Sequence, residues 1–252
     1  MLLPSMTYKE MYDHLAKDVF KVRIKQENLL PKAIRLLKKE RRFPVWRYYE
    51  YTAPITNNKY IIYFYAESRF HINKPTVGSF AVLFCENKRY VVQWVAGGYK
   101  HTKDGSLIAI RQIHAYTSHF FRRYNERHLK NESLDANDVA CAFLAGNQLR
   151  IPICMNEEIN RSLEKYGEGA KYGYQVRDGF CFADSWVEGV ESADGDRHND
   201  QVDAMLVLYK TFMDKLGLAD SQKIAIDKEK QDVIRRTIQD LQEKGQGELL
   251  LE

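Results

Sequence analysis

Short segments in which apolar and polar side chains alternate fill residues 43–115 and constrain the fold more than any other feature. Their period of two and their Val, Ile, Tyr and Phe content are typical of strands. The predicted strands cover residues 45–53, 60–66, 79–85, 90–95 and 106–115. Asn57-Asn58 and Glu86-Asn87-Lys88 have the chemistry of tight turns. Because short connections join antiparallel neighbours, we predict an antiparallel meander of about five strands.

Helical patterns flank this predicted sheet. Residues 7–42 are predicted to be helical, with a break at 28–31 before Pro31. Residues 117–243 are predicted to be mostly helical, including a regular apolar pattern over 202–216, with a small hairpin that turns at Arg177-Asp178-Gly179. We find no internal repeat, so we predict a single α+β domain over 1–252: helical 7–42, antiparallel sheet 43–115, and helical with a hairpin 117–243.

Composition limits the class of protein. No apolar run reaches the roughly 18 residues of a membrane span, and the first residues do not follow the pattern of a secretory signal. The four cysteines are widely spaced, which is typical of reduced thiols. We therefore expect a soluble cytoplasmic protein without a membrane partner. The net charge of +4 permits a nucleic acid or another anionic ligand and does not require one.

The densest group of reactive side chains lies at residues 106–131. The strand pattern there ends near His114, and Thr117 or Ser118 can cap a following helix. On that helix the aromatic side chains share one side, whereas His119 and Arg123 share a neighbouring face. We therefore expect His114 and His119 to project near the same strand–helix corner.

This corner suggests acid–base chemistry. Histidine titrates near neutrality, and arginine presents a fixed fork of donors that matches phosphate. The predicted catalytic residues are His114, His119, Arg123, Arg127 and His71. We predict an enzyme that uses them, without a metal or a cofactor, on a phosphate-containing substrate such as RNA. The structural alternative is a helix packed through its aromatic rings, with Arg122 and Glu126 as a solvated pair.

The predicted order of elements, helices followed by an antiparallel meander, resembles small metal-independent ribonucleases and ribosome-targeting toxins. In those families, His, Arg, Lys and Tyr side chains on or beside the sheet cleave RNA. The resemblance is one of architecture, and what it implies for this chain is an RNA substrate.

Two other functions fit the sequence. A non-enzymatic binding module would stack bases on the tyrosines of the first hairpin, or would contact phosphates through Lys38, Lys39, Arg41 and Arg42. A metal-assisted hydrolase would use the acidic loop 194–203, although that loop lacks the glycine and the final glutamate of a calcium loop. H-E-x-x-H and C-x-x-C motifs are missing, so we predict no metal site.

Overall fold

The computed structural model describes residues 1–101, 107–164, 170, 172–189 and 202–243. The elements in chain order are α1 (Tyr8–Leu37), β1 (Val45–Thr52), β2 (Lys59–Ala66), η1 (Arg69–His71), β3 (Thr76–Cys85), β4 (Lys88–His101), β5 (Leu107–Thr117), α2 (Ser118–Tyr124), η2 (Asn125–Leu129), α3 (Ala136–Gly146), β6 (Ile151–Cys154), α4 (Glu157–Glu164), β7 (Tyr172–Gln175), β8 (Gly179–Gly189), β9 (Val202–Asp214) and α5 (Asp220–Glu243). None of the described helices combines the length and apolar character that a membrane crossing requires.

The described strands form a nine-stranded mixed sheet in the order β1-β2-β3-β4-β5-β9-β8-β7-β6. The predicted mixture of helix and sheet is confirmed. The five antiparallel strands are present, but they form only part of this sheet. β9 joins the edge of β5 in parallel, and the predicted hairpin, β7 with β8, extends the sheet from there. The predicted meander and the predicted hairpin are thus both present, but they are parts of one larger sheet, which the prediction of a mostly helical C-terminal part missed.

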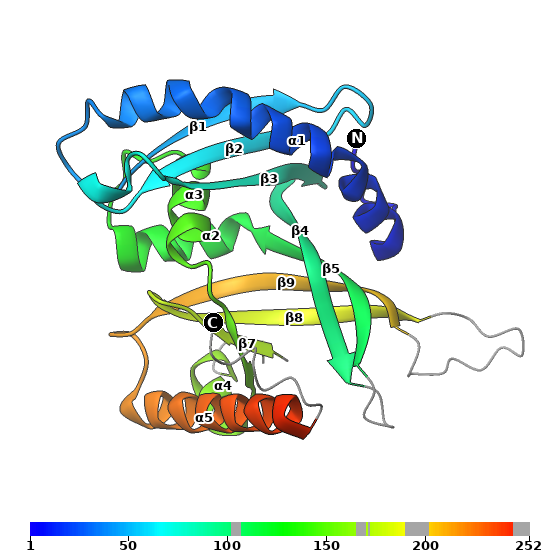
Figure 1. The fold of residues 1–252 in the computed structure, drawn as a ribbon. Helices are drawn as coiled ribbons and strands as arrows, with labels where there is room; N and C mark the ends of the chain where they lie inside the picture. The colour runs from blue at the N-terminus through cyan, green and yellow to red at the C-terminus, as the bar shows by residue number, and fades with distance from the viewer. Residues whose placement is uncertain (102–106, 165–169, 171, 190–201, 244–252) are drawn as a thin grey trace, which may run out of the picture.

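The sheet twists so strongly that it encloses two of its own helices. Figure 1 shows α2 and α3 between the strands β1 to β3 and the strands β8 and β9, with α1 and α5 on the outer faces. In a flat sheet the end of β2 and the start of β8 would lie at opposite ends. In this protein the two ends lie together, as the distance of 2.6 Å between Arg177 Nη1 and Glu67 Oε1 shows. A twist of roughly 20–25° per strand pair, repeated over the five pairs between β2 and β8, rotates these strands by about 100–125° and so carries the two ends toward each other.

The enclosed face carries an aromatic core. The predicted aromatic side of α2 is confirmed, since Phe120, Phe121 and Tyr124 are buried there. Tyr116 of β5 and Tyr209 of β9 stack with ring centroids 4.3 Å apart. Thr117 caps α2, as predicted, by accepting from the N–H of Phe120.

The predicted helix at 202–216 was wrong, because residues 202–214 form β9. Its apolar run satisfies both the helical period and the period of two, a known ambiguity of short apolar segments. The neighbours decide, since β5 and β8 pair with β9 on its two sides. Val207 and Tyr209 consequently face the enclosed core, and Leu206 packs against the core under α1.

The predicted break at 28–31 was also wrong. α1 begins with a capping box at Thr7 and continues through Pro31 to Leu37. A proline inside a helix removes a backbone hydrogen bond and crowds the preceding turn. Leu29, Ile34 and Leu37, on both sides of that position, pack against the sheet. This packing keeps the helix continuous.

Candidate functional site

His114 is held in the interior rather than in a cleft. Arg150 Nη1 lies 3.0 Å from His114 Nδ1, and the hydroxyl of Tyr209 lies 3.3 Å from the same nitrogen. A guanidinium only donates, so Nδ1 accepts and the ring proton resides on Nε2. Burial, and then the charge of Arg150, lowers the pKa of His114 to about 3. His114 is therefore neutral, and its basic nitrogen is already occupied.

Arg150 is the cation of this buried group. We call the group the Arg150 centre, and its members are Arg150, His114, Gln93, Tyr116 and Tyr209. Arg150 Nη2 donates to Gln93 Oε1 at 3.0 Å, and its guanidinium carbon lies 5.6 Å and 5.9 Å from the ring centroids of Tyr116 and Tyr209. Burial alone would lower the pKa of Arg150, but Tyr116 and Tyr209 outweigh it and raise that pKa. The chain thus holds a buried positive charge through aromatic rings and two neutral acceptors.

The predicted corner does not form. His119 is exposed on α2, where its Nδ1 lies 2.9 Å from Arg122 Nη2. Within the described part of the chain, no hydrogen bond or ring contact joins His119 to His114. The two side chains diverge because β5 turns His114 into the enclosed core, whereas the outer face of α2 turns His119 toward solvent.

The other predicted residues are also dispersed. Arg123 forms an ion pair with Glu126 at 2.9 Å on the exposed face of α2. Arg127 donates to the carbonyl of Phe212 in β9. His71 is exposed in η1, with its Nδ1 2.9 Å from the hydroxyl of Ser68. Arg122 and Glu126 lie 3.7 Å apart, as the structural alternative expected.

A different set of polar side chains does converge, where the end of β2 meets the turn between β7 and β8. Four segments that are distant in sequence contribute to it. We call this set the Asp178 cluster, and its members are Tyr65, Glu67, Tyr124, His128, Asn147, Arg177 and Asp178.

Asp178 is the centre of the cluster. Its Oδ2 accepts from the hydroxyl of Tyr124 and from Nδ2 of Asn147, both at 2.7 Å. Its side chain is 7% exposed. Burial would raise the pKa of Asp178, but the hydrogen bonds from Tyr124 and Asn147, together with His128 and Arg177, hold that pKa below its usual value. Asp178 is therefore an ionised, nearly buried carboxylate.

His128 joins this carboxylate from the solvent side. Its Nε2 lies 3.4 Å from Asp178 Oδ2, and its ring stacks on Tyr124 with centroids 5.1 Å apart. The side chain is 36% exposed. The ionised carboxylate can only accept, so it favours the tautomer with the proton on Nε2, in which Nδ1 keeps its lone pair. In the described residues nothing bonds to that Nδ1, so His128 presents an oriented and accessible base.

Arg177 places a positive charge on the other oxygen of Asp178. Its Nε donates to Asp178 Oδ1 at 3.2 Å, and its Nη1 pairs with Glu67. Burial opposes the charge, but hydrogen bonds with Tyr65 and Asp178 raise the pKa of Arg177. About half of the side chain is exposed. The guanidinium is thus charged and reaches solvent, and an anionic substrate would compete with Glu67 for it.

A basic surface adjoins the cluster. Val45 of β1 pairs with Ala66 of β2, so the residues just before Val45 and those just after Ala66 lie at the same end of this hairpin. Figure 1 shows the C-terminal end of α1, η1 and the end of α2 there, at the left of the view. The exposed cations at this end are Lys38, Lys39, Arg41, Arg42, Arg69 and Lys74.

The other sequence-based candidates find less support in the geometry. The tyrosines of the first hairpin do not form an open platform, because Tyr60, Tyr63 and Tyr65 are buried beneath helices. Residues 194–201 of the acidic loop lie outside the described residues. No group of three His, Cys, Asp or Glu side chains that could hold a metal occurs in the described part of the chain.

Sequence reasoning did not identify the central pair. His128 lies in the stretch that was singled out, but its partner Asp178 is 50 positions away in a turn that was interpreted only as a turn. The sequence did carry one signal for this site. A turn needs only Asp178-Gly179, so the additional charge of Arg177 beside Asp178 indicated a role other than turn formation. Comparison with protein-family models, curated proteins and solved structures finds no match for this chain.

Proposed function

We propose that this protein is an acid–base enzyme acting on a phosphate-containing polymer, with RNA as the substrate class and His128 as the base. The observation that carries the proposal is the exposed imidazole of His128, whose Nε2 lies 3.4 Å from the nearly buried carboxylate of Asp178. A base that is oriented by a carboxylate and still open to solvent is the arrangement that proton abstraction requires.

The proposed step is abstraction of a hydroxyl proton by His128 Nδ1. In RNA this hydroxyl is the 2′-OH, whose oxygen then attacks the adjacent phosphorus as the bond to the 5′ oxygen breaks. The products are a 2′,3′-cyclic phosphate and a 5′-OH, whose oxygen takes its proton from water. Asp178 stabilises the imidazolium that forms, because its carboxylate lies against Nε2–H. Arg177 stabilises the charge that develops on the phosphoryl oxygens.

The basic surface supports a polymeric substrate with many phosphates. Residues 17–42 carry ten Lys and Arg against three Asp and Glu, a net charge of +7 in a chain whose total is +4. The C-terminal part of this stretch adjoins the Asp178 cluster through the register of β1 and β2. Cations in a row contact successive phosphates, and binding of this kind weakens steeply as salt is added.

The test is cleavage of a labelled single-stranded RNA by the purified protein and two variants. His128→Ala should reduce the cleavage rate by about 10²-fold or more, since it removes the general base. Its RNA affinity should change little. His119→Ala is the matched control, because His119 is an exposed histidine on the preceding helix α2, outside the cluster, and it should cleave at the wild-type rate. Equal rates for all three proteins would contradict the proposal.

A second candidate is RNA binding without cleavage, which the charge of residues 17–42 supports independently. Changing Lys38, Lys39, Arg41 and Arg42 to Gln should weaken binding of any single-stranded RNA and reduce its salt dependence. The control changes four other cations, Lys215, Lys223, Lys228 and Lys230, to Gln. Binding that depends on the first set only, in a wild-type protein that never cleaves RNA, would favour this candidate over the enzyme.

A further inference from the structure

A cavity of about 260 Å³ lies on the other face of the sheet, between α1 and strands β2, β3 and β4. Its apolar walls come from Leu15, Val19 and Val22 of α1 and from Val92 and Trp94 of the sheet. Opposite the helix, β3 presents the small side chains of Ser79 and Ala81. Small residues at a helix–sheet contact leave space that larger side chains would fill, which explains why the cavity forms at this place.

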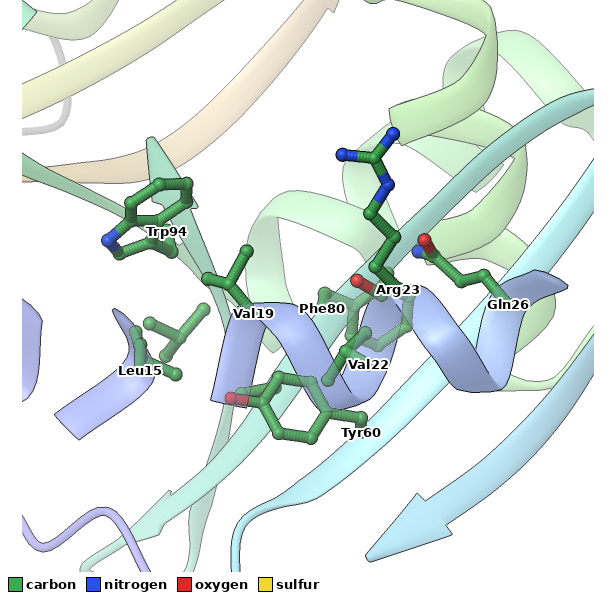
Figure 2. A pocket seen from close by; sticks show the side chains of 11 residues that line it. Leu15, Val19, Val22, Arg23, Gln26, Tyr60, Phe80 and Trp94 are labelled. Atoms are coloured by element: carbon green, nitrogen blue, oxygen red, sulfur yellow. The ribbon is translucent and has the colours of Figure 1, made fainter. Parts of the chain in front are cut away.

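The one charged side chain of the cavity and its one side-chain amide lie toward the same end. Figure 2 shows Leu15 and Trp94 at one end, and Arg23 and Gln26 at the other. Arg23 also lies 3.6 Å from Glu27, but the two side chains are 77% and 68% exposed, so that pair is weak and a ligand can compete with it. None of the residues that line the cavity is acidic. The entrance therefore favours an anion.

Two other polar groups border the cavity. The hydroxyl of Tyr60 donates to the buried carboxylate of Asp18 at 2.9 Å, so it is already engaged. Nε1 of Trp94 is buried and has no hydrogen-bond partner among the described residues. A buried donor normally has an acceptor, supplied by protein, water or a ligand. That nitrogen is buried and does not open into the cavity, which therefore combines apolar walls with a cation at its mouth.

We propose that this cavity binds a medium-chain carboxylate, with the chain between α1 and the sheet and the carboxylate at Arg23. A dry cavity of about 150 Å³ is enough for benzene. On the same scale, about 260 Å³ has room for roughly ten non-hydrogen atoms. An eight-carbon carboxylate has this size, and its single negative charge matches the single arginine. The site is independent of the Asp178 cluster, which lies on the enclosed face.

The test is calorimetric titration of the full chain with octanoate. Wild-type protein should bind one equivalent, and Arg23→Gln should weaken binding at least tenfold. Arg35→Gln is the matched control on the same helix, outside the cavity. Octanol, which has no charge, should bind the wild type no more tightly than octanoate binds Arg23→Gln.

A second pair of variants tests where the chain lies. Val19→Trp places a large ring into the cavity from its partly exposed wall and should abolish octanoate binding without lowering the melting temperature. Phe20→Trp changes the neighbouring exposed residue, which does not line the cavity, and should leave binding intact. Absence of binding to wild type at millimolar octanoate, or binding that survives both Arg23→Gln and Val19→Trp, would overturn the proposal.

Discussion

His114 and His128 come from the same stretch of sequence, yet the protein holds them in opposite ways. His114 is buried and accepts from the cation Arg150, so its lone pair is occupied and its pKa is low. His128 is exposed and faces the anion Asp178 through Nε2, which leaves the lone pair of Nδ1 open to solvent. The contrast between these two environments shows that the charge of the partner, together with exposure, decides whether a histidine stabilises a fold or offers a reactive nitrogen.

The comparison predicts the largest loss of stability at Arg150. Arg150→Ala leaves Gln93 and His114 without their donor and opens space between aromatic rings, so it should cost about 3–5 kcal/mol of unfolding free energy. Denaturant melts measure this. Arg35→Ala, an exposed arginine on α1, should change stability by less than about 0.5 kcal/mol. A loss below about 1 kcal/mol at Arg150 would show that the Arg150 centre is not structural.

Asp178 should have the next largest effect. Asp178→Ala leaves the buried groups of Tyr124 and Asn147 unpaired, and we expect a loss of about 2–4 kcal/mol. His128→Ala should cost less than about 1 kcal/mol, because His128 is exposed and its contact with Asp178 is long at 3.4 Å. The same denaturant melts measure both. Equal losses for the two variants would mean that His128 is as structural as its partner, which would remove the contrast with His114.

The pH dependence of stability is a further test, because it depends on how His114 titrates. Because the pKa of His114 is about 3 in the folded protein and about 6.5 in the unfolded chain, the unfolded chain binds a proton more readily. The stability that neutral His114 supports is therefore present above pH 6.5 and is lost as the pH falls toward 3. At pH 5 the loss should be about 2 kcal/mol.

The control for this prediction is His114→Gln, which can still accept from Arg150 and does not titrate. The difference in unfolding free energy between pH 7.5 and pH 5 should be smaller in this variant by about the same 2 kcal/mol. An identical pH dependence in wild type and variant would show that His114 titrates normally.

Local patterns in the sequence predicted the local structure well. The cap at Thr117, the aromatic side of α2 and the turn at Arg177-Asp178-Gly179 all follow from neighbouring residues. The parallel pairing of β5 with β9 could not be predicted in this way, because it joins residues about 90 positions apart. Without that pairing, the apolar run of β9 was indistinguishable from a helix.

The candidate site shows the same limit. His119 and Arg123 looked promising because they share a helical face, which sequence spacing reveals. The pairing of His128 with Asp178 depends on the twist that brings the start of β8 to the end of β2, and spacing carries no information on that twist. Arg150 was overlooked for a similar reason, since it lies in the connection between α3 and β6 and acquires its role from side chains of three strands, β4, β5 and β9.

The central claim is that His128 supplies a base, and chemical rescue tests it most directly. His128→Gly should lose RNA cleavage, and imidazole added to the solution should restore part of the rate, because a free base can occupy the space left open beside Asp178 and Arg177. His119→Gly with the same imidazole is the control and should show wild-type cleavage with no rescue. The account predicts a rate that rises with imidazole concentration in His128→Gly alone. Full cleavage by His128→Gly without imidazole would contradict it.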